Sequence, residues 1–243
     1  MIRPWFRAGV EAVQKSDQSP VTIADRAAEA AIRTVIAAHF PDHAFLGEED
    51  GLQQADSACE SAFCWVCDPI DGTRAFLTGR PSFGTLIALL ENGVPILGLI
   101  DQPITGERWL GVRGRPTRFT GPLGGQVGTR RGTALAQAEL SCTAPEIFEA
   151  DDTPRFAQLA RRVKRVSWGG DCYAYGLLAL GQIDVIAEAT LKIWDWAALV
   201  PVIEGAGGSL TDWQGRPLSA NSDGHALALG NPALLPEAVA ALN

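Results

Sequence analysis

The residues best suited to do chemistry lie in one short run, Asp68-Pro69-Ile70-Asp71-Gly72-Thr73. It follows an apolar segment that reads as a buried strand, so both carboxylates are expected just past the strand, with Pro69 stiffening the turn between them. Carboxylate and carbonyl oxygens are the ligands that the hard cations Mg²⁺ and Mn²⁺ prefer. Gly72 and Thr73 stand where a helix can begin, and their free N–H groups suit a phosphate. A capped surface turn with two hydrated acids is the alternative, and this run alone does not decide between them.

Two other acidic elements each have an ordinary explanation when they are taken singly. Gly47-Glu48-Glu49-Asp50 follows the apolar run 44–46, and acidic loops of this kind are commonly solvated. Asp195, between Trp194 and Trp196, stands at the start of a helical pattern from 195 to about 205, where a role as the helix N-cap accounts for it. The two flanking tryptophans, however, favour a partly desolvated carboxylate.

The elements that position these residues begin with a helix. Thr22-Ile23-Ala24-Asp25 has the form of a capping box, and the apolar spacing after it predicts an amphipathic helix that reaches Phe40 and is stopped by Pro41. Asn92-Gly93 between two apolar segments is the strongest short-range sign of a hairpin. The polar segment 52–61 is expected to be a surface loop. The strands predicted in this half lie at 63–67, 83–90, 94–100, 107–112 and 117–119.

The glycine-rich stretch 121–132 has the composition of turns and little periodicity, so we place a boundary between two halves there. Beyond it, strands are predicted at 139–142, 163–167 and 184–187. Helices are predicted near 145–149, 154–162, 172–181 and 195–205, the last ended by Gly207-Gly208. We therefore expect a single domain over 1–243, with an α+β subdomain over about 1–125 and an α/β subdomain over about 126–243.

Composition narrows the class of partner. The chain has 20 Lys and Arg against 28 Asp and Glu, a formal net charge of −8, and no basic run. This argues against a nucleic-acid partner, because the phosphate backbone of a nucleic acid requires a basic face. An acidic enzyme that acts on an anionic phosphate needs cations between the two, and bound divalent metals would then be the dominant local charges.

Cysteine usage and hydropathy bear on the compartment. Of the five cysteines, at 59, 64, 67, 142 and 172, only Cys64 and Cys67 have the C-x-x-C spacing, and they lie in an apolar run without a second ligand pair. Buried thiols are therefore favoured over a redox or zinc pair. There is no secretory signal and no apolar run of membrane-spanning length, so a cytoplasmic protein without a membrane partner is expected.

In this order and at these spacings, the three acidic elements together resemble the inositol monophosphatase family. The resemblance runs from Val21-Thr22-Ile23-Ala24-Asp25 to Glu204-Gly205-Ala206-Gly207-Gly208, and the run Asp68–Thr73 is its most specific motif. It implies a layered α/β/α/β/α sugar-phosphatase-like fold, a homodimer, and a phosphate-monoester hydrolase with two or three Mg²⁺ ions per active site, Mn²⁺ being possible in their place. The chain departs from the family in a shorter first helix, since only Ile2 to Val13 precede the loop around 16–19.

The resemblance also implies a role for each matching residue. The implied metal ligands are the carboxylates of Glu48, Asp68, Asp71 and Asp195. The backbone carbonyl of Ile70 is a further ligand. The Gly72 and Thr73 amides hold the phosphate. Glu48, with Thr73 and Asp25, positions the attacking water and helps to deprotonate it. Metal ions would lower the pKa of that water and clamp the attacking and leaving oxygens, so no phosphorylated enzyme is needed.

A further set of blocks concerns the substrate. Trp168 to Gly176, Gly79 to Thr85, and Arg74-Ala75-Phe76 look like the corresponding blocks of histidinol-phosphate phosphatases within the family. By this resemblance Asp171 lies in the leaving-group pocket and Glu188 contacts the substrate. Two such acids favour an ester that carries an ammonium group over the ester of a neutral polyol. Histidinol phosphate, an intermediate of histidine biosynthesis, carries such a group. Capping of a helix that begins near 172 is the alternative role for Asp171, and the two roles are compatible.

Other functions stay open at this point. The enzyme alternatives are an inositol-1-phosphate phosphatase, a sugar bisphosphatase or a nucleotide 3′-phosphatase, each acting on a small phosphorylated metabolite. A non-catalytic regulator that keeps the fold and binds a macromolecule is the alternative from another class, although a scaffold would not need Thr73 and every metal carboxylate. Arg74 and Lys192 either help to hold phosphate or are solvated charges, and His43 and His225 are expected to be structural.

Overall fold

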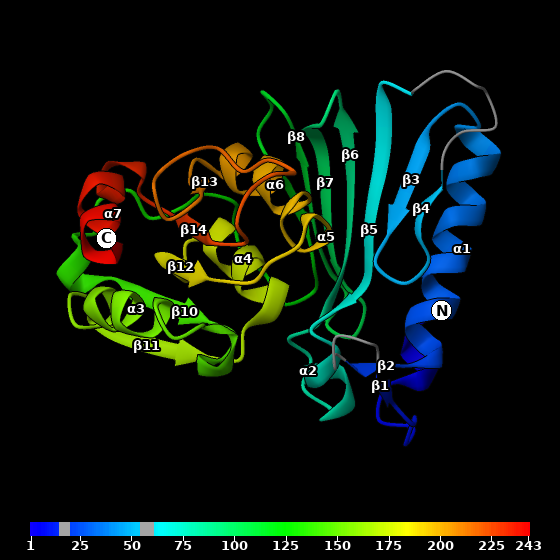
Figure 1. Cartoon of the computed structure of the whole chain (residues 1–243), viewed down its shortest axis with the longest axis horizontal. Helices are drawn as coiled ribbons and strands as arrows, with labels where there is room; N and C mark the ends of the chain where they lie inside the picture. The colour runs from blue at the N-terminus through cyan, green and yellow to red at the C-terminus, as the bar shows by residue number, and fades with distance from the viewer. Residues whose placement is uncertain (15–19, 54–60) are drawn as a thin grey trace.

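Two large β-sheets form the frame of the protein in the computed structural model, which describes residues 1–14, 20–53 and 61–243. One sheet has seven strands in the order β4-β3-β5-β6-β7-β8-β9, and the other has five in the order β11-β10-β12-β14-β13. Helix α1 covers the outer face of the first sheet, α4 and α6 lie between the sheets, and α3 and α7 cover the second (Figure 1). These layers give the predicted α/β/α/β/α fold.

The seven-stranded sheet is antiparallel except where β3 runs parallel to β5. Its strands are β3 Ala44–Gly47, β4 Gly51–Gln53, β5 Phe63–Asp71, β6 Gly84–Glu91, β7 Val94–Gln102, β8 Glu107–Val112 and β9 Arg118–Thr120. Asn92 and Gly93 both have positive φ, +49° and +79°, as a tight β6–β7 hairpin requires. The hairpin prediction is therefore confirmed. Two short strands, β1 Val13–Gln14 and β2 Pro20–Val21, pair separately.

Strand β5 corrects the prediction that the acidic run lies past a strand end. The strand continues through Asp71, and its pairing with β6 shifts register between Asp68 and Asp71. The irregularity falls at Pro69, which has no N–H to donate to a sheet ladder. The predicted loop at 52–61 also begins too early, because β4 includes Leu52 and Gln53. Residues 54–60 of that loop, which include Cys59, lie outside the described residues. So does the predicted loop at 16–19.

Helix α1, Ile23–His39, has the predicted capping box. The Thr22 hydroxyl accepts from the Ala24 N–H at 3.1 Å, and the Thr22 N–H donates to Asp25 Oδ2 at 2.9 Å. Among residues 1–14, only a 3₁₀ turn at Arg3–Trp5 is helical. The expected short α-helix over 2–13 is therefore wrong for this chain.

The second half adds the five-stranded sheet and most of the helices. Its strands are β10 Glu139–Cys142, β11 Arg165–Trp168, β12 Val185–Glu188, β13 Ser209–Thr211 and β14 Ala226–Leu229. The α-helices after α1 are α2 Thr73–Leu77, α3 Asp152–Ala160, α4 Asp171–Ala179, α5 Ile193–Trp196, α6 Leu199–Ala206 and α7 Leu235–Leu242. Short 3₁₀ turns lie at Leu135–Gln137, Pro145–Ile147 and Pro232–Leu234. The first large sheet ends at Thr120 and the second begins at Glu139, while the division into subdomains stays a prediction.

Two predicted helices have a different form in the structure. The segment near 145–149 is only a 3₁₀ turn, and the helix predicted over 195–205 is broken into α5 and α6. The break has a local cause, because Pro201 cannot donate the hydrogen bond that would reach back to the carbonyl of Ala197. Gly207, with φ +100°, ends α6 as a left-handed cap, which confirms the glycine stop signal.

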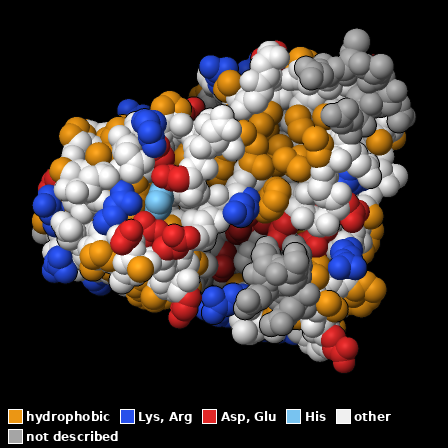
Figure 2. All heavy atoms as spheres, in the orientation of Figure 1, with side chains coloured by type: hydrophobic (Ala, Val, Ile, Leu, Met, Phe, Trp, Pro, Cys, Tyr) orange, Lys and Arg blue, Asp and Glu red, His pale blue; other side chains and the backbone are white. Residues whose placement is uncertain are grey.

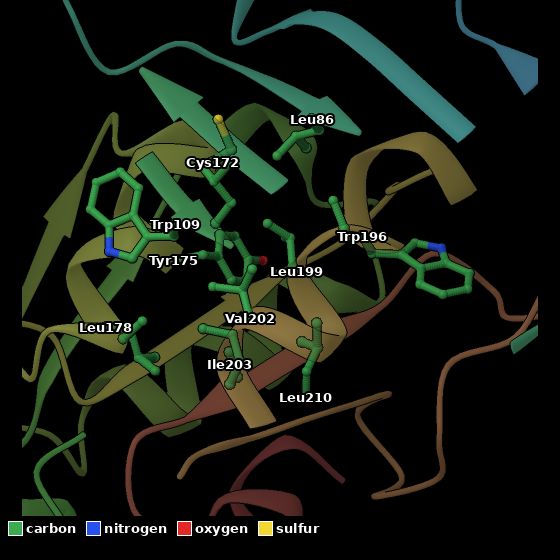
Figure 3. Close-up of a cluster of buried hydrophobic side chains, with 14 of the residues drawn as sticks. Leu86, Trp109, Cys172, Tyr175, Leu178, Trp196, Leu199, Val202, Ile203 and Leu210 are labelled. Carbon is green, nitrogen blue, oxygen red and sulfur yellow. The ribbon is translucent and has the colours of Figure 1, made fainter. Parts of the chain in front are cut away.

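Between the two sheets lies the main apolar core, formed largely by α4 and α6 packed on β6, β7 and β8 (Figure 3). Figure 3 shows Tyr175 of α4 facing Leu199 and Val202 of α6. Two glycines let α6 approach the first sheet: a Cβ on Gly98 would lie 1.9 Å from the Ala198 carbonyl oxygen, and one on Gly111 would lie 2.3 Å from the backbone of Pro201. This close packing fixes α6, and with it α5, beside β5. No helix in the described part of the chain is long and apolar enough to cross a bilayer.

Candidate active site

Three aspartates converge where the first sheet meets the helices of the second half. Asp68 and Asp71 come from β5 and Asp195 from α5, and one carboxylate oxygen of each lies within 4.8 Å of the others. The register shift in β5 turns both of its acids toward α5, because without the irregularity Asp68 and Asp71 would point to opposite faces of the sheet. The structure thus brings together three of the four carboxylates predicted as metal ligands.

The three aspartates concentrate carboxyl groups in a region that burial has largely desolvated. Burial raises the pKa of Asp68 well above its usual value, and the charges of Glu48, Asp71 and Asp195 raise it further. Burial, followed by the charges of Asp195 and Asp171, likewise raises the pKa of Asp71. No cationic side chain is among the causes of either shift. A group of oxygen donors with this unbalanced charge fits a bound hard cation.

Asp195 belongs to the same cluster but not as the predicted N-cap. Lys192 is the N-cap of α5, and Asp195 Oδ2 accepts the Lys192 N–H at 2.6 Å from the third helical position. Burial raises the pKa of Asp195 to about 7, and the charges of Glu48 and Glu188 raise it as well. The hydrogen bond from Lys192 opposes this shift. The partly desolvated aspartate that the flanking tryptophans predicted is confirmed.

Glu48 reaches the cluster through strand pairing. Gly47 at the end of β3 is paired with Cys67 of β5, and the Glu48 N–H donates to the Cys67 carbonyl at 3.1 Å. Glu48 therefore follows β3 at the level where Asp68 follows Cys67. The charge of Glu48, and a hydrogen bond that the protonated Asp68 carboxyl can donate to it, both contribute to the raised pKa of Asp68, so the two carboxyl groups are neighbours.

Helix α2 begins beside the acids, as predicted for a phosphate cradle. Gly72 is its N-cap with φ +86°, a left-handed conformation that disfavours a side chain. The Thr73 hydroxyl donates to the Ile70 carbonyl at 3.2 Å, so the predicted carbonyl ligand and the predicted water-orienting hydroxyl touch one another.

Asp25 is fully buried, with one carboxylate oxygen engaged and one without a partner among the described residues. Its Oδ2 accepts from Thr22, and burial raises its pKa despite those hydrogen bonds. No hydrogen bond joins Asp25 to Thr73 within the described residues, so the network expected between them stays a prediction.

A pocket of about 300 Å³ adjoins the cluster. Its walls come from both halves of the chain and include Asp71, Gly72, Thr73, Asp171, Glu188 and Asp195. Figure 2 shows acidic side chains gathered in the hollow between the two halves, with basic side chains at its edge. Arg74 lines the pocket but its side chain is 66% exposed, which leaves room for either predicted role.

Asp171 opens α4 but does not cap it. Helix α4 has no side-chain cap, and Asp171 Oδ2 instead accepts the Ser82 hydroxyl at 2.6 Å. Asp171 has φ +45°, and its carboxylate lies so close to Gly72 that a Cβ there would be 2.8 Å from Asp171 Cγ. The capping interpretation of Asp171 is therefore wrong, and its side chain faces the predicted phosphate cradle.

Glu188 lies at the end of β12, where two partners hold its carboxylate. Oε1 accepts from the Thr143 N–H at 2.8 Å and from the Thr143 hydroxyl at 2.5 Å, and Oε2 accepts from the Tyr175 hydroxyl at 3.2 Å. Burial, opposed by these hydrogen bonds, raises its pKa. Ser82 and Thr143 are site residues that sequence reasoning missed. Ser82 lay in a block already singled out, whereas Thr143 gave no signal, because its role depends on β10 pairing with β12.

The two C-x-x-C cysteines, Cys64 and Cys67, and the histidines His43 and His225 do not line the pocket. Cys64 and Cys67 are free thiols in β5, and burial raises the pKa of each. His43 accepts from the Trp65 indole N–H at 3.1 Å, and His225 Nε2 lies 2.8 Å from Asp152 Oδ1. These contacts support the structural roles expected for both histidines.

Comparisons with known proteins agree with this geometry. The profile of the inositol monophosphatase family matches residues 2–243. The chain is 49% identical over 216 residues to the bifunctional phosphatase IMPL2 of Arabidopsis thaliana, covering 89% of this chain and 61% of that protein. It is 34% identical to the histidinol-phosphatase of Chlorobaculum parvum, covering 97% and 88%. A solved inositol monophosphatase from Zymomonas mobilis superposes with a TM-score of 0.87 at 46% identity, covering 99% and 91%.

Proposed function

Because the chain belongs to the inositol monophosphatase family and is a phosphatase, we propose that it hydrolyses histidinol phosphate to histidinol and phosphate with the help of Mg²⁺. The single observation that carries the proposal is the meeting of the three-aspartate cluster with a pocket that contains two further carboxylates, Asp171 and Glu188. The cluster supports metal-dependent phosphate chemistry, and the additional acids support a cationic leaving group.

The residues that would hold the metal are Glu48, Asp68, Asp71, Asp195 and the Ile70 carbonyl, two or three ions being expected. When bound, Mg²⁺ would offset the charge of the phosphate and make a coordinated water more acidic. The donor set fits this role, because it consists of oxygen atoms alone, and among the described residues no cation is named as a cause of the pKa shifts of Asp68 and Asp71.

The chain's own groups would then orient and deprotonate the nucleophile. The Thr73 hydroxyl, already directed at the Ile70 carbonyl, would orient the attacking water, and the Glu48 carboxylate would accept its proton. Asp25 would support Thr73 from the start of α1. The Gly72 and Thr73 amides would hold the phosphate oxygens at the start of α2, where backbone N–H groups lack helical partners.

Asp171 and Glu188 would select the leaving group. Histidinol carries a primary ammonium group, and a carboxylate in a partly desolvated pocket attracts such a cation more strongly than it would in water. Ser82 fixes the direction of Asp171, and Thr143 with Tyr175 fixes Glu188. A neutral polyol gains nothing from these charges, so the same acids would disfavour inositol phosphate.

An ester panel tests the proposal directly. Phosphate release is measured with Mg²⁺ from histidinol phosphate, inositol 1-phosphate, a sugar bisphosphate and a nucleotide 3′-phosphate. We expect the highest kcat/KM for histidinol phosphate. Inositol 1-phosphatase activity is the second candidate, favoured by the 46% identity to the solved inositol monophosphatase, and faster turnover of that ester would overturn the first.

The variant Asp171→Asn separates recognition from chemistry. It keeps the shape of the side chain and a hydrogen bond to Ser82 but removes the charge. We expect the preference for histidinol phosphate over inositol 1-phosphate to fall about tenfold, which corresponds to about 1.4 kcal/mol of discrimination. An equal loss for both esters would show that Asp171 supports the site without selecting the substrate.

A further inference from the structure

We propose that Glu29 of α1 is a positioning residue that holds the turn carrying Glu48 in place for metal binding. The inference rests on the proposed function, because it assumes that Glu48 is a metal ligand. Glu29 belongs to none of the motifs described above, and it lies in the helical layer on the outer face of the first sheet.

Glu29 is a fully buried carboxylate that accepts two backbone hydrogen bonds from the acidic turn. Its Oε2 accepts the Glu49 N–H at 2.8 Å, and its Oε1 accepts the Asp50 N–H at 3.1 Å. Arg33, one helical turn later, donates to Oε1 at 2.7 Å and so balances the buried charge. The two amides that follow Glu48 are thus anchored to one side chain of α1.

The turn has little freedom around this anchor. Gly47 and Gly51 face one another across the β3–β4 hairpin, and Glu48, Glu49 and Asp50 form the connection between them. A Cβ on Gly47 would lie 2.1 Å from Glu29 Oε1, so the carboxylate rests directly against the backbone of residue 47. Gly47 does not have positive φ, which means that close approach rather than backbone conformation requires a glycine there.

Two contacts together set the position of Glu48. On one side its own N–H donates to the Cys67 carbonyl, which places it beside Asp68. On the other side the next two amides donate to Glu29. A side chain that must reach a cation held by Asp68 needs a fixed backbone, because partners of metal ligands set the ligand geometry and so the affinity.

The carboxylate chemistry of Glu29 is specific to this task. Two oxygens without hydrogens can accept two amides and a guanidinium at once. In a Glu29→Gln variant, one oxygen becomes an NH₂ group that faces an N–H donor of the turn. One amide then loses its acceptor, and the turn is free to shift.

The test compares Glu29→Gln with a matched control, Asp212→Asn. Asp212 is also a buried carboxylate that accepts two backbone amides, those of Gln214 and Arg216, and an arginine side chain. It follows β13 in the second sheet and does not line the pocket. Two quantities are measured for each protein: the Mg²⁺ concentration that gives half-maximal activity, and the Mg²⁺ concentration that gives half of the metal-induced rise in melting temperature without substrate.

For Glu29→Gln we expect both concentrations to rise about 10- to 100-fold, the usual effect of removing the partner of a metal ligand, and activity to recover partly at high Mg²⁺. Asp212→Asn is expected to lower the melting temperature while leaving both concentrations unchanged. Wild-type Mg²⁺ dependence in Glu29→Gln would overturn the proposal and leave Glu29 a purely structural residue.

A second variant covers the case in which Glu29→Gln does not fold. Gly47→Ala keeps every charged group but pushes the Glu29 carboxylate away, and we expect the same loss of Mg²⁺ affinity. An unchanged Mg²⁺ affinity in that variant would also overturn the proposal. Failure of the proposed metal site has a different signature, because the wild-type protein would then show no Mg²⁺-induced rise in melting temperature at all.

Discussion

The Asp71 carboxylate accepts a hydrogen bond from the backbone N–H of Cys172 at 2.7 Å, across 101 residues of chain. Asp71 belongs to the first sheet, and Cys172 belongs to the first turn of α4 in the second half. The bond fixes a proposed metal ligand to the element that also carries Asp171. This contact therefore ties the proposed metal site to the helix that carries the proposed substrate-selecting residue.

The variant Asp71→Asn tests the metal role of this residue. The amide oxygen can still accept from Cys172, so we expect the fold to persist, but the lost charge weakens metal binding directly. Turnover at saturating Mg²⁺ should fall by more than about 100-fold, the upper end of the penalty for altering a partner of a metal ligand. Asp101→Asn, which alters an exposed ion pair with Arg108 in the same sheet, is the control and should retain activity. Near-wild-type turnover of Asp71→Asn would refute the ligand assignment.

Metal should stabilise the fold as well as support catalysis. The carboxylates of the cluster raise one another's pKa values because they are buried together, and a cation relieves that repulsion. At a Mg²⁺ concentration about 100 times the Kd, linkage predicts about 2.7 kcal/mol of stabilisation. For a chain of this size that corresponds to a melting temperature roughly 5–10 °C higher than in EDTA. The rise should be absent in KCl of equal ionic strength; a similar rise there would indicate screening rather than site binding.

Gly72→Ala should damage the site more than the fold. Its positive φ and the contact with Asp171 both oppose a side chain. Gly114 offers a matched control, because it has φ +74° with no atom within 4 Å of an added Cβ. Each alanine should lower the free energy of unfolding by roughly 1–2 kcal/mol through backbone strain. Only Gly72→Ala should also lose at least about tenfold in kcat/KM, by displacing Asp171 and the amides proposed to bind phosphate. Equal kinetics in the two variants would contradict the assigned cradle.

The pH dependence of stability should reveal the buried state of Glu188. Its folded-state pKa is raised by burial, so the folded protein holds the proton more tightly than the unfolded chain does. Its contribution to stability is therefore present below the unfolded pKa and is lost as the pH rises through the folded pKa. The Asp171 charge helps to raise this pKa, and the Glu188 charge in turn raises the pKa of Tyr175, Cys142 and Asp195. Its removal lowers the pKa of Asp195, which shifts the pH dependence in the same direction as the loss of Glu188 itself. As the pH rises above the ordinary pKa of a glutamate, about 4.3, Glu188→Gln should therefore gain stability relative to the wild type in metal-free buffer.

For Glu139→Gln, the difference in stability from the wild type should change with pH in the opposite direction. Hydrogen bonds from Arg165 lower the pKa of Glu139, so its contribution is present above the unfolded pKa and is lost as the pH falls through the folded value. This pair is exposed, so a small effect is expected. Chemical denaturation across the pH range measures both variants, and a common sign would show that the assigned environments are wrong.

Much of the local structure was legible in the sequence because it depends on neighbours along the chain. Thr22 and Asp25 cap α1 through their own backbone groups, Asn92-Gly93 closes the β6–β7 hairpin, and Gly207 ends α6. The three acidic elements together, with the run Asp68–Thr73 as the most specific of them, likewise predicted the family and, through the resemblance, the layered fold.

What the sequence could not give were the contacts between elements far apart in it. The continuation of β5 through Asp71 depends on pairing with β6, the orientation of Asp171 depends on Ser82 of another segment, and the position of the acidic turn depends on Glu29. Each of these joins groups that only the packed sheets and helices bring within hydrogen-bonding distance. Local propensity and motif spacing determined which residues we predict to carry the chemistry. Long-range pairing decided how these residues face one another, because burial removes water and leaves other protein groups as their partners.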